Sequence, residues 1–182
     1  MLTQTYASCI YMAVLRLFFA LAAAHGLIVV FGDVVNAFQQ APPPSQQCYL
    51  EIDESILDWL DRKHGHKADP KKEVIPIHKA LQGHPEASAL WERMIQKILL
   101  VDLGLRTTTH ERGIYSGEVE VNGQSHKLLL ARQVDDFAIA SPHESAAKAI
   151  YEMIKDKVHT EYEGMGFQDH LGVHTRFNGF DV

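Results

Sequence analysis

The stretch from residue 113 to residue 141 constrains the fold of this chain more than any other. Asn122-Gly123 separates two alternating segments, and Asp135-Asp136 separates the second of them from the apolar run "FAIA" (137–140). Asn-Gly is a strong signal for a two-residue hairpin turn, and aspartate is common in turns because its side chain bonds nearby backbone. The stretch therefore predicts consecutive antiparallel strands joined by two hairpin turns, with two adjacent carboxylates at the second turn.

A long apolar run, "CIYMAVLRLFFALAAAHGLIVVFG" (9–32), lies near the N-terminus. Arg16 falls inside this run and His25-Gly26 interrupts it. This pattern favours a buried helix over about residues 6–24 and a buried strand over 27–32, which Asp33 directly follows. The length of the run also allows a second interpretation, in which it anchors the chain in a membrane. We favour the first interpretation and expect no membrane association.

The rest of the chain predicts both helices and strands. The cluster "QQAPPPSQQ" is typical of a loop, and Gly65 and Gly104 follow two helical patterns. Ser141, Pro142 and Glu144 together form a capping-box signal for the start of a helix. The predicted strands cover 48–52 and 74–78, and the predicted helices cover 55–65, 87–102 and the segment from 141 onward. This order predicts an α+β fold in which helices cover a largely antiparallel sheet.

Composition limits the classes of function. The chain has 17 Lys plus Arg against 23 Asp plus Glu, which gives a formal net charge of −6. This balance lacks the basic footprint that is common among nucleic-acid-binding domains. Cys9 and Cys48 match neither a metal-ligand spacing nor a disulfide framework. Such sparse cysteine use fits an intracellular, reducing setting.

Three carboxylates form the candidate site. If the strand that Asp33 follows lies beside the strands that flank Asp135 and Asp136, all three side chains meet at one end of the sheet. Carboxylates that lie so close together raise one another's pKa unless a cation binds between them. Mg²⁺ prefers carboxylate oxygens as ligands. A plainer interpretation stays open, in which Asp135 and Asp136 serve a turn and Asp33 caps the end of a strand.

Motifs around these carboxylates resemble a known family. "GDVVNAF" (32–38) resembles the first catalytic motif of reverse transcriptases, and "QVDDFAIA" (133–140) resembles their Tyr-x-Asp-Asp motif. Between them, "HKALQGHPEASALW" (78–91) is similar to the copia-type motif Lys-Ala-Leu-Tyr-Gly-Leu-Lys-Gln-Ala-Pro-Arg-Ala-Trp. The residues that keep both identity and spacing in it are Lys79, Ala80, Leu81, Gly83, Ala87 and Trp91. With three motifs in order, the chain resembles the reverse transcriptase domain of a copia-type LTR retrotransposon Pol polyprotein.

The resemblance implies a fold and a partial domain. It implies a right-hand polymerase palm with part of the fingers, and residues 1–182 as a single partial reverse transcriptase domain. On this resemblance we expect the N-terminal fingers strands, the thumb and the RNase H domain of the family to be missing from the sequence. We therefore expect a fragment or a divergent copy of the family.

The resemblance also implies a chemistry for the carboxylates. Asp33, Asp135 and Asp136 would be the catalytic residues and would bind two Mg²⁺ ions, which Mn²⁺ can replace. The backbone carbonyl of Val34 would be a further ligand. A primer 3′-OH would attack the α-phosphate of a deoxynucleoside triphosphate, and pyrophosphate would leave. Phe38 would be the steric gate that leaves no room for a ribose 2′-OH.

The remaining implied contacts involve template, primer and the polyprotein. Gln82 and Gly83 would lie near the template and the nucleotide, and Gln133 would lie against the primer. The implied partners are an RNA template, a DNA or tRNA primer, a dNTP and the rest of the Pol polyprotein. The implied location is an intracellular one, in a cytoplasmic particle or the nucleus.

Departures from the family pattern keep several functions open. Gln133 stands where the family has tyrosine, and Pro85 and Glu86 stand where it has Lys-Gln. One hypothesis is an active RNA-directed DNA polymerase domain. A second is a catalytically inactive relic that retains the palm fold. A third is an unrelated domain that uses residues 9–32 as a membrane anchor.

Overall fold

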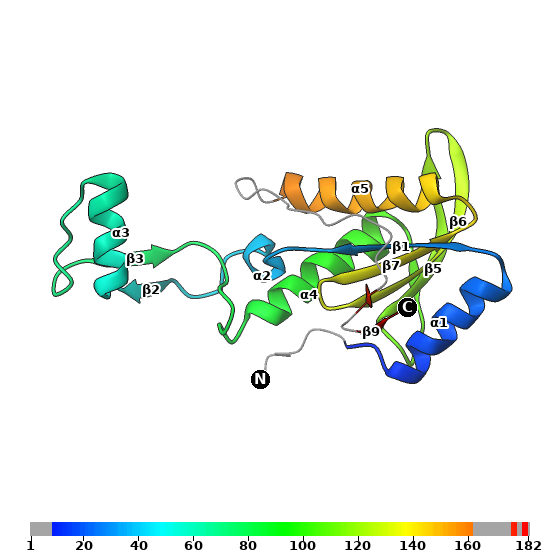
Figure 1. The fold of residues 1–182 in the computed structure, drawn as a ribbon, viewed down its shortest axis with the longest axis horizontal. Helices are drawn as coiled ribbons and strands as arrows, with labels where there is room; N and C mark the ends of the chain where they lie inside the picture. Colours follow the sequence, from blue (N-terminus) through cyan, green and yellow to red (C-terminus); the bar gives the residue numbers. More distant parts are fainter. Residues whose placement is uncertain (1–8, 162–175, 178–179, 182) are drawn as a thin grey trace.

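The body of the protein is one antiparallel sheet with helices on both faces (Figure 1). The structure is a computed structural model, and it describes residues 9–161, 176–177 and 180–181. Within these residues the largest sheet has five strands in the order β1-β7-β6-β5-β4. Its strands are β1 (Ile28–Asp33), β4 (Arg106–Thr107), β5 (Ile114–Val121), β6 (Gln124–Gln133) and β7 (Asp136–Ser141). The predicted α+β class with an antiparallel sheet is confirmed.

Both predicted hairpins are present. Asn122 and Gly123 join β5 to β6 with φ values of 51° and 77°, and a positive φ at both central residues defines the turn that Asn-Gly favours. Val134 and Asp135 form the turn between β6 and β7, and Gln133 pairs with Asp136 across it. The turn prediction therefore holds for Asp135, whereas Asp136 is the first residue of a strand.

One face of the sheet is covered by the N-terminal helix α1 (Met12–Ala24). Gly26, with a φ of 63°, ends this helix and leads into β1. The helix begins later than predicted, and residues 6–8 of the predicted helix lie outside the described residues. The apolar side chains that join α1 to the sheet are Leu15, Phe18, Ala22, Phe31, Ala131, Ala138 and Ala140. No helix in the described part of the chain is both long enough and apolar enough to cross a membrane.

The opposite face of the sheet carries the larger core. Helix α4 (Ala87–Lys97) runs directly into a π-helical turn, η1 (Ile98–Asp102), and both pack there with helix α5 (Glu144–Glu161). This confirms the predicted helix over 87–102. The fully buried apolar side chains of this core include Trp91, Ile95, Ile98, Leu99, Leu130, Ile139 and Ile150.

The start of α5 differs from the capping-box prediction. Ser141 is the last residue of β7, it is fully buried, and its Oγ donates a hydrogen bond to the carbonyl of Lys127 at 3.3 Å. The carbonyl of His143 instead accepts hydrogen bonds from the backbone N–H groups of Ala146 and Ala147. Pairing of β7 with β1, in which Ser141 lies opposite Ile28, therefore takes Ser141 into the sheet and delays the start of the helix.

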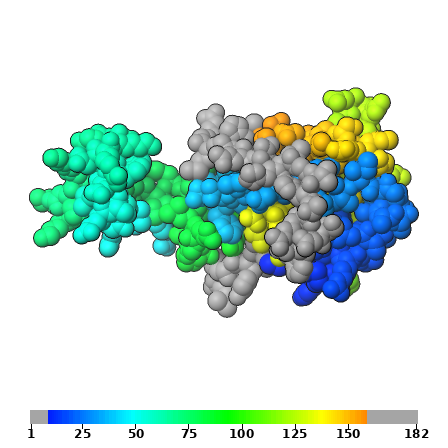
Figure 2. Space-filling model, in the orientation of Figure 1, coloured from blue at the N-terminus to red at the C-terminus, as the bar shows by residue number. Residues whose placement is uncertain are grey.

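A small lobe projects from one end of the body (Figures 1 and 2). It consists of α3 and a separate antiparallel pair of strands, and a short helix, α2, lies between β1 and this lobe. Asp53 caps α3 by accepting a hydrogen bond from the N–H of Ile56 at 2.9 Å, and Gly65, with a φ of 63°, ends it. The bounds are α2 (Ala37–Gln40), β2 (Cys48–Glu51), α3 (Glu54–His64) and β3 (Val74–Ile77).

The C-terminal part contributes one described pair of strands. β8 (Arg176–Phe177) pairs antiparallel with β9 (Phe180–Asp181).

Gly32 allows α5 to approach the end of β1. A Cβ at this position would overlap the ring of Tyr151, whose Cζ lies 2.6 Å from where that Cβ would be. The Tyr151 ring is fully buried, and its hydroxyl donates a hydrogen bond to the carbonyl of Asp33 at 3.1 Å. The glycine therefore lets α5 hold the backbone of Asp33 from the covered face of the sheet.

We expect Gly32→Ala to lower the free energy of unfolding by about 1–3 kcal/mol, since the added methyl group must displace a buried ring. Urea denaturation measures this change. In a Tyr151→Leu background the ring is absent, so the same glycine substitution should have a much smaller effect. An equal loss in both backgrounds would show that the ring does not impose the glycine.

Candidate functional site

The pairing of β1 with β7 brings two of the candidate carboxylates together. Asp33 ends β1 and lies directly opposite Asp136, the first residue of β7. Gln133, the last residue of β6, lies opposite Asp136 on its other side. Residues directly opposite each other in an antiparallel pair project from the same face of the sheet. The three side chains therefore share one face at one end of the sheet.

That face is the one that α4 and α5 leave uncovered. Val30 and Phe137 belong to the core under α4 and α5, whereas Phe31 belongs to the cluster on the α1 side. Side chains alternate between faces along a strand, so Asp33 and Asp136 project to the α1 side. Helix α1 itself lies toward the other end of β1 (Figure 1).

Asp135 occupies the turn between the strands. Its carbonyl accepts a hydrogen bond from the N–H of Val34 at 3.1 Å, which ties the turn to the end of β1. The pKa of the Asp135 carboxyl is raised, first by burial and then by the negative charge of Asp33. A hydrogen bond from its own backbone and the positive charge of Arg132 act in the opposite direction. The ionised form of Asp135 is therefore held in an unfavourable environment.

The donor chemistry of this site suits a hard divalent cation. Carboxylate oxygens are the ligands that Mg²⁺ prefers, and a cation would offset the repulsion that raises the pKa of Asp135. Among the residues that the structure describes, no three His, Cys, Asp or Glu side chains are gathered closely enough to hold a metal ion as they stand. Metal binding by Asp33, Asp135 and Asp136 therefore stays a prediction.

Val34 and Phe38 continue the chain from Asp33. Val34 is buried, and its N–H is the donor to the turn described above. Phe38 lies on α2 and is partly buried against the larger core. Asn36, between them, takes a left-handed conformation with a φ of 54°, which bends the chain sharply after the strand. This bend places α2 directly beyond the carboxylate end of β1.

Gln82 and Gly83 lie on a different element. They form an exposed turn ahead of α4, in which Gly83 has a φ of 92°. They are placed by the start of α4 and not by the turn between β6 and β7.

Glu86, three residues after Gly83, accepts hydrogen bonds from the N–H of Ser45 at 2.8 Å and from its Oγ at 2.6 Å. These bonds lower the pKa of Glu86 and join the proline-rich loop to the start of α4.

The side chain of Gln133 is engaged by the N-terminal segment. Its Oε1 accepts a hydrogen bond from the N–H of Ile10 at 2.6 Å. The next N–H, that of Tyr11, donates to Oε2 of Glu111 at 3.3 Å. The chain ahead of α1 therefore runs beside the end of β6, a contact that no local sequence signal indicates.

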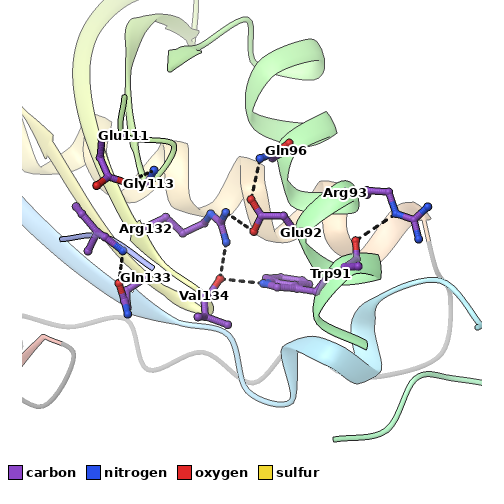
Figure 3. A network of polar contacts seen from close by, with 11 residues as sticks. Trp91, Glu92, Arg93, Gln96, Glu111, Gly113, Arg132, Gln133 and Val134 are labelled. Atoms are coloured by element: carbon purple, nitrogen blue, oxygen red, sulfur yellow. Dashed lines mark hydrogen bonds and ion pairs between the residues drawn. The ribbon is translucent and has the colours of Figure 1, made fainter. Parts of the chain in front are cut away.

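A buried polar network behind the turn was not predicted from the sequence (Figure 3). Arg132 is fully buried and forms an ion pair with Glu92 at 2.7 Å. Its Nη1 donates a hydrogen bond to the carbonyl of Val134 at 2.9 Å, and Nε1 of Trp91 donates to the same oxygen at 2.8 Å. The available signal was an arginine inside an apolar strand and a glutamate beside a tryptophan on an apolar helix.

Comparisons with known proteins identify one family. The sequence profile of the family described as "Reverse transcriptase (RNA-dependent DNA polymerase)" matches residues 2–179 of the chain. Neither a curated protein nor a solved structure matches the chain significantly.

We expect Asp135→Asn to stabilise the protein at neutral pH. Because the pKa of Asp135 is higher in the folded protein than in the unfolded chain, its ionisation lowers the free energy of unfolding as the pH rises through the folded pKa. The cost is absent below the ordinary value of 3.8. Urea denaturation across this pH range should therefore show an advantage of the variant that grows with pH and then levels off.

Asp58→Asn is the matched control for this experiment. Asp58 lies on the exposed helix α3, paired with Arg62 at 3.7 Å. Exposed pairs of this kind contribute little to stability, so we expect a change below about 0.5 kcal/mol. An Asp135 variant no more stable than the wild type at pH 7 would contradict the electrostatic account of the turn.

Proposed function

The chain belongs to the reverse transcriptase (RNA-dependent DNA polymerase) family, and we propose that it is an RNA-directed DNA polymerase domain of the copia type. One observation carries the proposal beyond family membership. Asp33 and Asp136 pair directly across neighbouring strands, with Asp135 in the turn beside them. This arrangement fits carboxylates that act together on one substrate.

The fold supports a polymerase palm. The antiparallel sheet has two helices behind it and the carboxylates on the other face at one end. The lobe formed by β2, α3 and β3 corresponds in this proposal to part of the fingers. The chain would act within a Pol polyprotein, on an RNA template with a DNA or tRNA primer.

In the proposed reaction, Asp33, Asp135 and Asp136 would hold two Mg²⁺ ions. When bound, such ions neutralise charge on the attacking and leaving oxygens of an in-line phosphoryl transfer. The protein's part is to fix the carboxylates: β1 and β7 set the separation of Asp33 and Asp136, and the Val34 N–H holds the Asp135 backbone. The primer 3′-OH would lose its proton to solvent as its oxygen bonds the α-phosphorus of a dNTP, and the bond from that phosphorus to the leaving pyrophosphate would break.

Further residues would bind the substrates. Phe38 follows the carboxylate strand closely enough to serve as a gate under the sugar. Gln82 and Gly83, exposed ahead of α4, would contact template and nucleotide. Gln133 shares the face of Asp136 and would meet the primer, for which its bond to the N–H of Ile10 would have to open.

We expect the chain to extend an oligo-dT primer on a poly-rA template in the presence of Mg²⁺. Asp135→Asn removes a carboxylate from the proposed ion site, so the rate should fall by about 100-fold or more. Residues that only support metal ligands typically cost about 10- to 100-fold in activity when they are replaced, and a ligand itself should cost at least as much. Incorporation of labelled dTTP measures the rate. Asp58→Asn, on the lobe, should leave the rate unchanged.

A second measurement separates an active domain from an inactive relic. A ligand that binds the folded state raises the melting temperature by mass action. Mg²⁺ should therefore stabilise the wild type and stabilise Asp135→Asn much less. Stabilisation without extension would favour the relic with an intact ion site, and the absence of both effects would contradict the proposed function.

The gate predicts a change in sugar selectivity. Phe38→Ala should raise the ratio of ribonucleotide to deoxynucleotide incorporation by about tenfold, which corresponds to about 1.4 kcal/mol of lost discrimination. Phe38→Tyr keeps the ring and should keep the selectivity. Single-nucleotide extension with rUTP and dTTP measures the ratio. Equal ratios for the alanine variant and the wild type would remove Phe38 from this role.

A further inference from the structure

Arg132 is a charged residue in an otherwise apolar environment. It lies on β6, none of its surface is exposed, and its neighbours on that strand include the buried residues Leu130 and Ala131. A buried charge is costly unless it is paired and hydrogen-bonded. Glu92 on α4 supplies the partner at 2.7 Å, and Gln96 donates a hydrogen bond to the other carboxylate oxygen of Glu92 at 2.7 Å.

Stability alone does not account for this pair. Replacing a buried ion pair by apolar side chains of similar volume is often neutral or stabilising. Most of the residues buried around this pair are apolar, so leucine or methionine would suit both positions. The role of the two charges therefore lies in the groups that they hold in place rather than in the stability that they add to the fold.

What Arg132 holds is the carbonyl of Val134, which it shares with Trp91 (Figure 3). Val134 has a φ of 56°, a conformation that is unfavourable for a β-branched residue. A strained residue of this kind persists only where its surroundings fix it. Two donors from behind the sheet, one on β6 and one on α4, fix this peptide.

The peptide that carries this oxygen is the one that joins Val134 to Asp135. Its orientation therefore sets the direction in which the Asp135 side chain leaves the turn. The next carbonyl, that of Asp135, accepts a hydrogen bond from the N–H of Val34. The carbonyls before and after the Asp135 side chain are thus both held by hydrogen bonds, and none of these bonds involves the Asp135 carboxylate.

We propose that Arg132 and Trp91 are positioning residues that aim the carboxylate of Asp135, and that Glu92 keeps Arg132 in place for this task. The inference rests on the proposed function, because it assigns these residues to the same site. They act through the Val134 carbonyl and touch neither substrate nor cation. They differ in this from Asp33, Asp135 and Asp136.

Trp91→Phe is the sharpest variant, because it removes one donor to Val134 without changing any charge. Amide hydrogen exchange of Val34 reports whether the turn stays against β1, and it needs no activity. Binding of Mn²⁺, measured by the electron paramagnetic resonance of the free ion, reports the carboxylates. We expect Val34 exchange to accelerate at least tenfold relative to the amides of β6, and Mn²⁺ to bind about tenfold more weakly, as for residues that support metal ligands.

Two controls separate positioning from loss of packing. Leu99→Ala removes a fully buried side chain from η1, about two turns further along the same helix. It should lower the melting temperature at least as much as Trp91→Phe, while the Val34 amide exchanges in step with β6. Arg93→Ala removes an exposed donor that bonds the carbonyl of Ala89, one turn earlier in α4, and should change neither readout.

A double variant, Arg132→Met with Glu92→Leu, tests the ion pair without leaving one charge alone. We expect it to fold with a melting temperature close to that of the wild type and to show the same faster Val34 exchange and weaker Mn²⁺ binding. Unchanged exchange and Mn²⁺ affinity in both Trp91→Phe and the double variant would overturn the proposal. If the wild type binds no Mn²⁺, the proposed function fails, and Val34 exchange still decides whether the network positions the turn.

Discussion

Antiparallel pairing between β1 and β7 joins two segments that lie far apart in the sequence, with Ile28 opposite Ser141 at one end and Asp33 opposite Asp136 at the other. The other features of the site depend on this register. A shift by one residue would move Asp33 to the face that α4 and α5 cover. The burial of Val30 and Ile139 under those helices opposes such a shift, so packing of the core on one face fixes the carboxylates on the other.

The two faces of the sheet therefore have different roles: one supports the backbone of the site, and the other carries Asp33 and Asp136. Behind it, two aromatic side chains from different helices donate to carbonyls next to the carboxylates: Tyr151 to Asp33 and Trp91 to Val134. In the turn at the end of the sheet, burial and the charge of Asp33 raise the pKa of Asp135. Rigid support of groups that repel one another is a common arrangement at functional sites, and a cation that relieves the repulsion would gain affinity from it.

Local sequence signals predicted much of this fold. Asn122-Gly123 predicted the first hairpin correctly, Gly65 marked the end of α3, and the helix predicted over 87–102 corresponds to α4 and η1. Ser141 was assigned wrongly because its capping signal is local, whereas its place in β7 comes from pairing with Ile28 on the distant strand β1. The hydrogen bond between Ile10 and Gln133 and the Arg132–Glu92 ion pair could not be predicted for the same reason. Each joins residues that only the tertiary fold brings together. Family resemblance supplied roles for Asp33, Asp135 and Asp136 that spacing alone left open.

The lobe of β2, α3 and β3 differs from the body of the protein in how it is expected to unfold. None of the residues of α3, all of which the structure describes, is buried, and the lobe's two strands pair only with each other within the described residues. Segments with few buried apolar contacts open at a lower free energy than the core to which they are attached. We therefore expect the lobe to open at a lower free energy than the five-stranded sheet, so that it can unfold and refold while the carboxylates at the end of the sheet stay in place.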